Sequence, residues 1–433
     1  MNNKKNKKPE FLPNIGRICF SFGILILPSA FLYSSILLLI SFIIASTKSG
    51  NFLKDKWNIP LIICSFLMIF VCLITNIFPT KYYEFITDKF LNWIGLLNWI
   101  PMFWVYWSSQ YYLKTSQDRI SCAYLLVLGT IPILISGIGQ FYFNWYGPVT
   151  FLNNTIIWYQ RESFPQVLTG LFNNPNYAGT WLATIFPFSF FFFLKAAKIS
   201  FKKVFFSFTS FITILSIFLT HSRNAIMNFF ISFTLLIGIS FKTLFLISSI
   251  FFIFISIFFM LEIPLGSLSF FRNNSIINSF MPDTNNFYDI FSFKRIKIWR
   301  TAISNIFANP FLGWGASSFS IIYLMKNGER TFQHTHNLML EVANNYGIVI
   351  SLILFTTIFL LMYKSKPNFS QQNFFILDNE LINKFWWVST LIILLMHLTD
   401  ITYYDGRISL LFWILISGVR CNLRENNNNK SLV

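Results

Sequence analysis

The feature of this sequence that most constrains its fold is a series of apolar runs. Many of them exceed the roughly 18 residues that cross a bilayer as a helix. Hydrophobic residues make up 55% of the chain and charged residues only 11%, whereas a soluble domain carries about 25% charged residues. So few charges cannot cover the surface of a soluble protein of 433 residues. The sequence therefore predicts an all-α, polytopic integral membrane protein.

We predict about twelve transmembrane helices, of which the first two are short and separated near Pro28. The predicted spans lie near residues 15–31, 32–47, 58–78, 91–112, 119–141, 173–194, 203–220, 224–241, 243–262, 336–362, 385–399 and 407–420. One long polar loop separates the ninth span from the tenth.

This loop divides the chain into four predicted parts. Helices one to nine occupy residues 1–262, and the loop with an amphipathic helix inside it occupies 263–335. Helices ten to twelve occupy residues 336–420, and a disordered tail follows at 421–433.

Basic residues concentrate in alternate loops, for example at Lys4 to Lys8 before the first span and at Lys195 to Lys203 after the sixth. Because cytoplasmic loops carry an excess of Lys and Arg, we expect both termini in the cytoplasm and the long loop on the outer side. The net charge of +17 is then mostly an orientation signal. This interpretation removes the case for nucleic acid as a partner.

The long loop should contain an amphipathic helix over residues 293–309. Ile296, Trp299, Ile303 and Ile306 recur there at helical spacing. Three basic residues share one face of this helix: Lys294, Lys297 and Arg300. Arg295 points elsewhere, toward the side that other loops could cover. An interfacial helix with lysines among lipid headgroups is the alternative interpretation of this face.

Pro310 should end this helix, and Gly313 and Gly315 allow a tight turn after it.

Two of the four histidines, His334 and His336, lie at the start of the tenth span. If this segment is helical, His334 shares a face with Asn337 and Glu341, while His336 points almost the opposite way. A zinc pair on a helix needs i,i+4 spacing, and no third ligand is evident, so we predict no metal site. A histidine at a membrane surface can act as a general base near neutral pH. A hydrogen-bonded interfacial histidine is the alternative.

Two arginines stand out at the same side of the membrane. Arg223 follows His221 and Ser222 at the junction of the seventh and eighth spans. An arginine there must snorkel or pair, or it serves as an anion ligand. Arg161 lies in the second-longest outer loop, 142–172. Arginine suits a diphosphate, because its planar fork makes paired, charge-assisted hydrogen bonds.

In order, sidedness and spacing, these segments resemble the O-antigen ligase and polymerase family of bacterial envelope glycosyltransferases, which includes protein O-oligosaccharyltransferases. The matching motifs are Gly170-x-Phe172-x-Asn174-Pro175-Asn176, Ser222-Arg223, Arg295-x-x-x-Trp299, Asn309-Pro310-x-x-Gly313-x-Gly315, and His334-x-His336-Asn337 with Glu341 and Gly347.

The resemblance implies transfer of a glycan from a polyprenyl diphosphate carrier to an acceptor hydroxyl at the periplasmic face of the bacterial inner membrane. No metal, nucleotide sugar or other cofactor is implied. His336 would be the catalytic base, and Arg223 and Arg295 would bind the diphosphate. The further candidates for substrate binding are Arg161, Arg300, His334 and Asn337.

The motifs leave the acceptor open. A ligase would use the lipid A core in lipopolysaccharide biosynthesis, a polymerase another carrier-linked unit, and an oligosaccharyltransferase a protein hydroxyl. The motif set favours the ligase. A small-anion transporter, such as a bicarbonate carrier, is the alternative from a different class. Transporters show repeated halves and interrupted helices at the midplane, and this sequence shows no internal repeat. The sequence does not specify an oligomeric state.

Overall fold

A computed structural model describes residues 11–50, 52–78, 90–163, 166–196, 200–238, 293–328, 332–369 and 378–430. The ninth predicted span, 243–262, and the part of the long loop before residue 293 lie outside these residues, as do the first ten residues of the chain and the last three.

The described residues are mostly helical, and they confirm an all-α polytopic membrane protein. The helices are α1 (Phe11–Ile26), α2 (Phe31–Lys48), α3 (Ile59–Ile77), α4 (Leu91–Leu97), α5 (Ile100–Ser109), α6 (Ser116–Phe143), α7 (Pro175–Lys195), α8 (Phe201–Leu219), α9 (Arg223–Leu236), α13 (Phe293–Ala308), α14 (Ser318–Asn327), α15 (Leu338–Tyr346), α16 (Ile348–Lys364), α17 (Asp378–Met396) and α18 (Gly406–Lys430). Short 3-10 turns lie at Phe52–Lys54 and Gln110–Tyr112.

Six of the described helices are long and apolar enough to cross a membrane, namely α2, α3, α6, α7, α8 and α18. Helices α1 and α16 are shorter and also apolar. The total of twelve spans stays a prediction. The loop after α6 holds an antiparallel hairpin that the sequence analysis missed, formed by β1 (Val149–Phe151) and β2 (Ile156–Trp158).

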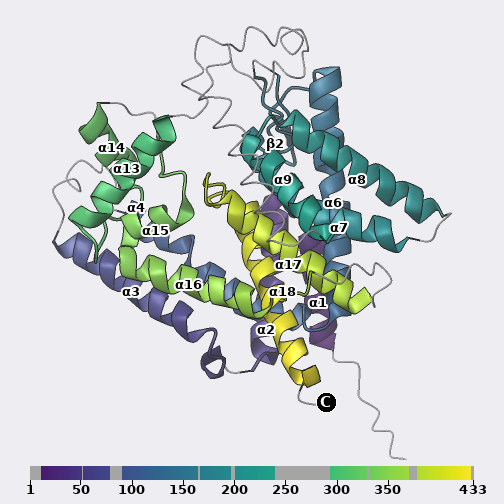
Figure 1. Cartoon of the computed structure of the whole chain (residues 1–433), viewed down its shortest axis with the longest axis horizontal. Coiled ribbons are helices and arrows are strands. Elements are labelled where there is room, and N and C mark those ends of the chain that lie inside the picture. Colours follow the sequence, from purple (N-terminus) through teal and green to yellow (C-terminus); the bar gives the residue numbers. More distant parts are fainter. Residues whose placement is uncertain are drawn as a thin grey trace, which may run out of the picture.

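Helices α17 and α18 cross the centre of the molecule (Figure 1), and the other helices gather around them. Helices α7 and α9 pack against α17, and α8 packs on α7. Helices α3 and α16 run side by side on the other flank, and α13, α14 and α15 gather beyond them with α4. Core residues of α18 such as Trp413 and Ile414 are almost completely buried.

Two predicted spans are not single helices. The span predicted at 91–112 consists of α4 and α5 with a turn between them, and the span predicted at 336–362 divides into α15 and α16. The second break lies at Gly347, whose φ of 95° is a conformation that favours glycine. A helix cannot continue through such a residue.

The turn after α13 seals this break with backbone hydrogen bonds. The N–H groups of Trp314 and Gly315 donate to the carbonyl oxygens of Asn344 and Asn345, at 2.8 and 3.0 Å. These carbonyls belong to the last turn of α15, which has no partners of its own for them. The N–H of Ile348 also donates to Pro310 O at 2.7 Å. The Asn309–Gly315 motif therefore has a structural role here.

The C-terminal residues correct the predicted domain boundary. We predicted a disordered tail from residue 421, but α18 continues to Lys430. Ion pairs explain the difference, since Asp55 accepts hydrogen bonds from Arg420 and Arg424 at 3.0 and 2.8 Å. Arg119, which is completely buried in α6, pairs with Glu425. Charges on two other segments thus hold the end of this helix.

Two glycines allow a test of the helix break. Both Gly347 and Gly328 have positive φ, but a Cβ on Gly347 would overlap Phe311 O, whereas a Cβ on Gly328 meets no atom within 4 Å. Gly328→Ala should cost only the strain of a left-handed residue, about 1–2 kcal/mol. Gly347→Ala should abolish most folded protein, measured by size-exclusion chromatography after stepwise heating. Equal melting temperatures for the two variants would contradict this account.

Candidate functional site

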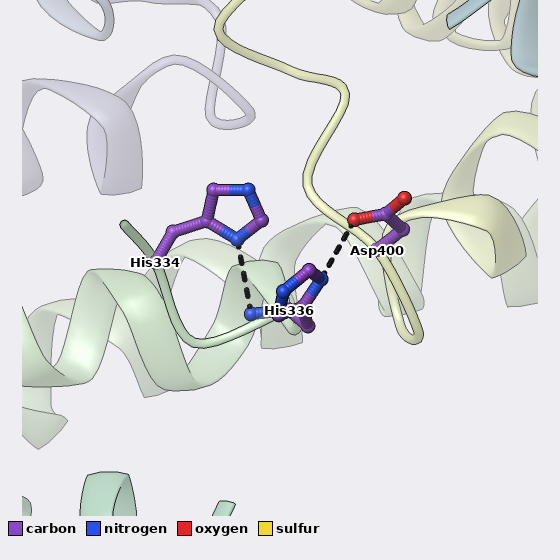
Figure 2. A group of neighbouring side chains, drawn as sticks. All are labelled: His334, His336 and Asp400. Atoms are coloured by element: carbon purple, nitrogen blue, oxygen red, sulfur yellow. Dashed lines mark hydrogen bonds and ion pairs between the residues drawn. The ribbon is translucent and has the colours of Figure 1, made fainter. Parts of the chain in front are cut away.

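The segment that carries His334 and His336 is not helical, which corrects the helical geometry considered for it. Helix α15 begins only at Leu338, after the two histidines. Between them, Thr335 is fully buried, and its N–H donates to Glu341 Oε2 at 2.9 Å. The two imidazole rings therefore meet, with 4.3 Å between their centroids, instead of pointing apart (Figure 2).

Asn337 explains where the helix begins. Its Oδ1 accepts hydrogen bonds from the N–H groups of Met339 and Leu340, both at 3.0 Å. This is the usual bonding of a helix N-cap. Its Nδ2 donates to Leu398 O at 2.9 Å. The Asn337 side chain therefore fixes α15 against the loop between α17 and α18, which is a positioning role.

His336 pairs with an aspartate that the sequence analysis missed. His336 Nδ1 lies 2.9 Å from Asp400 Oδ1, and 23% of the His336 side chain is exposed against 9% for Asp400 (Figure 2). The two residues are 64 positions apart in the chain. The sequence did offer one signal for Asp400. The chain has only 16 acidic residues, and Asp400 lies in the last loop that is predicted to face the outside.

Asp400 is held from three directions. Its Oδ1 also accepts from the N–H of Ile401 at 2.9 Å, and its Oδ2 accepts from Asn176 Nδ2 at 2.8 Å. Burial alone would raise the pKa of this carboxyl group, but the hydrogen bond and charge of His336 outweigh burial and lower the pKa. Asp400 is therefore a carboxylate at neutral pH.

This arrangement determines which nitrogen of His336 can act as a base. A carboxylate is only an acceptor, so Nδ1 of His336 carries a hydrogen, and in the neutral imidazole the lone pair is on Nε2. The backbone of His336 has φ of 53°, a left-handed conformation that costs a non-glycine residue about 1–2 kcal/mol. Such strain often accompanies functional positions.

His334 is the neutral member of the pair. Its Nδ1 accepts a hydrogen bond from the N–H of His336 at 3.3 Å. Burial and then the charge of His336 lower the pKa of His334 to about 4, and Asp400 partly opposes this lowering. His334 therefore remains an uncharged imidazole at neutral pH.

His334, His336 and Asp400 are also the kind of residues that bind metal ions, and their possible ligand atoms lie within 4.8 Å of one another. Asp400 is the third group that the sequence analysis did not find. The hydrogen bonds, however, already engage Nδ1 of both histidines and both carboxylate oxygens. His336 Nδ1 faces the carboxylate as a donor, His334 Nδ1 accepts a backbone N–H, and both Asp400 oxygens accept further donors. This pattern favours proton transfer over metal binding.

Arg223 lies at the same end of the bundle as His336, on the first turn of α9. Ser222 caps this helix through a hydrogen bond from the N–H of Ala225 to its Oγ. Asn224 Nδ2 donates to Met396 O at 2.9 Å, and Met396 ends α17 four residues before Asp400. The start of α9 is thus attached to the loop that carries Asp400.

The amphipathic helix predicted at 293–309 is present as α13, but its buried face differs from the prediction. Ile296 and Ile303 are 52% and 43% exposed, whereas Ile298 and Ala302 are fully buried. Of the four expected apolar residues, Ile306 is buried and Trp299 is half-buried, so only part of the predicted face packs against α14 and α15.

Arg295 lies on this buried face, and Arg300 does not. Arg295 is half-buried, and helical spacing aligns it with Ile298 and Trp299. Ile298 and Trp299 belong to a hydrophobic cluster with Phe332, and the Phe332 ring centroid is 6.0 Å from that of His336. Arg300 is exposed. The structure therefore links the helix of Arg295, through Phe332, to the histidine.

Arg161 is exposed, and its backbone is fixed at the end of α6. Its N–H donates to Thr169 Oγ1, and its carbonyl accepts from Gln140 Nε2. The chain then continues to α7, where Asn174 forms the cap and Asn176 reaches Asp400. The loop of Arg161 thus leads directly into the helix whose Asn176 contacts Asp400.

A further arginine at this end, Arg407, is engaged in contacts within the protein. Arg407 is 8% exposed, forms an ion pair with Asp405, and donates to Leu171 O at 3.2 Å. Its guanidinium also lies 4.0 Å from the centre of the Phe172 ring. The Arg407 side chain therefore connects the start of α18 to the residues just before α7.

Two hollows adjoin the site. A cavity of about 580 Å³ is lined by Phe332 and His334 together with residues of α4, α14 and α15. A second, mostly apolar groove of about 520 Å³ runs between α16 and α17, from His397 and Leu398 at one end to Tyr363 and Lys366 at the other.

Residues 208–355 match the model of the O-antigen ligase family. This segment, rather than the whole chain, resembles the O-antigen ligase family. It contains Arg223, Arg295, Arg300 and both site histidines, whereas Arg161 and Asp400 lie outside it. A search of the curated proteins found no match. The O-antigen ligase region indicates a glycosyltransferase-type membrane enzyme, with lipid-linked glycan and bilayer as its partners.

The lowered pKa of His334 predicts a pH-dependent stability. Between pH 6.5 and about 4 the unfolded chain binds a proton that the folded His334 does not, so the stability of the folded state falls as pH falls through this range. His334→Gln, which keeps an acceptor for the His336 N–H, should reduce the slope of melting temperature against pH. Identical slopes for the variant and the wild type would contradict the assignment.

Proposed function

We propose that this protein is an O-antigen ligase that transfers a glycan from a polyprenyl diphosphate carrier to a hydroxyl of the lipid A core. The single observation that carries the proposal is the His336–Asp400 pair at 2.9 Å in a membrane protein with an O-antigen ligase region. A base with its Nε2 lone pair available suits the deprotonation of a hydroxyl acceptor.

The proposed step is direct displacement at the anomeric carbon. The acceptor oxygen forms a bond to that carbon while the bond to the carrier phosphate breaks. The electron pair of the broken bond goes to the diphosphate, and the acceptor proton goes to His336 Nε2. Asp400 stabilises the imidazolium that results, because its carboxylate already accepts the Nδ1 hydrogen.

The diphosphate gains negative charge in this step, so the enzyme needs cations beside it. Arg223 suits this role because it stands on the first turn of α9, where the helix end adds a partial positive charge. Arg295 would complete the clamp from α13. Arg161 and Arg300 are proposed as secondary contacts, and both are exposed.

The carrier tail requires an apolar path out of the site. The groove between α16 and α17 begins at Leu338 and Leu398, and Leu398 O accepts the side-chain hydrogen bond of Asn337. A polyprenyl chain lying in this groove would place its diphosphate near the start of α15.

The remaining parts of the proposal concern the setting. We place the protein in the bacterial inner membrane, with both termini in the cytoplasm and the site on the periplasmic side. The positive charges of alternate loops support this orientation. We propose a reaction without metal, in which His336 Nδ1, His334 Nδ1 and the Asp400 oxygens keep the hydrogen bonds that they form in this structure.

The first test uses the purified full chain in detergent with polyprenyl diphosphate-linked oligosaccharide, a lipid A core acceptor and excess chelator. Transfer should proceed with chelator present. His336→Ala should lower kcat by about 10²–10⁴, as expected for loss of a general base, and Asp400→Asn should also lower kcat. Asp118→Asn, at the distant ion pair with Arg17, should retain activity.

Full activity of His336→Ala would overturn the proposal. Lengthening of the donor glycan without transfer to the lipid A core would make the protein a polymerase, and transfer to protein hydroxyls alone would make it an oligosaccharyltransferase.

A second test addresses the diphosphate. Arg223→Lys keeps the charge but loses the planar fork, so the KM for the lipid-linked donor should rise about tenfold, while the KM for the acceptor stays constant. Arg17→Lys, an exposed arginine in α1, is the control. Equal donor KM values in both variants would exclude Arg223 as a diphosphate ligand.

A further inference from the structure

The cavity of about 580 Å³ lies immediately beside the proposed base. Phe332 and His334 form part of its wall, and their ring centroids are 6.0 and 4.3 Å from that of His336. The remaining wall comes from α4, the start of α14, the end of α15 and Tyr404. Two side chains of the cavity wall are thus direct neighbours of the base.

The lining is polar and aromatic, without formal charge. Its aromatic members include Trp99, Tyr346 and Tyr404, and its amides and hydroxyls include Asn98, Gln333, Asn345, Ser317 and Ser320. None of the described residues that line it is Asp, Glu, Lys or Arg. A diphosphate would find no cation here. Amide and hydroxyl groups both donate and accept hydrogen bonds, as a polyol requires.

The aromatic wall is fixed in place before any ligand binds. Trp99 stacks on Tyr403, with 4.6 Å between ring centroids. Tyr403 in turn donates to Asn98 O at 2.7 Å and accepts from Trp413 Nε1 at 2.8 Å. A preformed surface of this kind loses little entropy on binding. Trp99 and Tyr346 are 2% and 1% exposed, so the C–H face of a sugar ring would pack chiefly against Tyr404, which is 37% exposed, while its hydroxyls reach the amides.

Glu341 connects this wall to the base. It is 2% exposed, and its carboxylate accepts from Thr335 N–H, Asn345 Nδ2 and Tyr404 Oη. Thr335 lies between the two site histidines, and the other two residues line the cavity. The same carboxylate therefore sets the relative positions of the cavity and His336.

We propose that this cavity binds an uncharged sugar residue of the acceptor and directs its hydroxyl toward His336. The inference rests on the proposed glycosyl transfer and names the acceptor as a saccharide. The apolar groove between α16 and α17 and the arginine of α9 serve the donor, so the two substrates reach the base from different elements.

The test measures binding and does not depend on turnover. The probe is the soluble core oligosaccharide released by mild acid from rough lipopolysaccharide, and saturation-transfer NMR with the full chain in detergent measures its affinity. Ser320→Phe places a ring in the cavity and should weaken binding at least tenfold. Ser304→Phe adds the same ring on the exposed side of α13 and should leave binding unchanged. His336→Ala should also bind normally.

A second variant protects the test against misfolding. Gln333→Ala removes an exposed lining amide and should weaken binding several-fold. If the wild type fails to bind the core oligosaccharide, or if Ser320→Phe and Gln333→Ala bind as the wild type does, the cavity proposal is wrong. Loss of binding only for the donor oligosaccharide would equally overturn it. The proposed reaction is judged separately, by transfer in His336→Ala.

Discussion

The Asp400 carboxylate is the interaction on which the site depends. It accepts hydrogen bonds from His336, from Asn176 of α7 and from its own loop at Ile401. Three segments far apart in the chain are therefore joined by one buried charge. Removing one partner of such a group leaves a buried acceptor unsatisfied, which costs more than the bond itself contributes. The orientation of the His336 ring and the position of the start of α7 therefore depend on the same carboxylate.

The motifs of the sequence divide into two kinds once the structure is known. Some contribute side chains, as His336 and Arg223 do. Others act through their backbone, since the turn at Asn309–Gly315 binds the end of α15 with N–H and carbonyl groups. The glycines in that turn bring two backbones together, because a Cβ on Gly313 would lie 2.7 Å from Asn344 O. A motif can therefore be specific without touching a substrate.

Much of the fold follows from the spacing of apolar residues and from the length of the apolar runs. These local signals predict the membrane helices and α13. The break at Gly347 was missed because it depends on a distant turn that supplies hydrogen bonds. The helical extension of α18 was missed because Asp55 and Arg119 hold it from other segments. Asp400 was missed for the same reason, because its partner His336 lies 64 positions away in the chain. Within the site, the histidine segment was misjudged as helical because the capping role of Asn337 was not used.

The order of the site residues along the chain has a consequence for biosynthesis. His336 is translated and inserted before Asp400, and α18 is the last described helix. Until the ribosome has released that helix, the histidine segment lacks the carboxylate that orients its ring, and α7 lacks the partner of Asn176. The contacts of Asp400 with His336 and Asn176 can therefore form only after the loop between α17 and α18 has been synthesised.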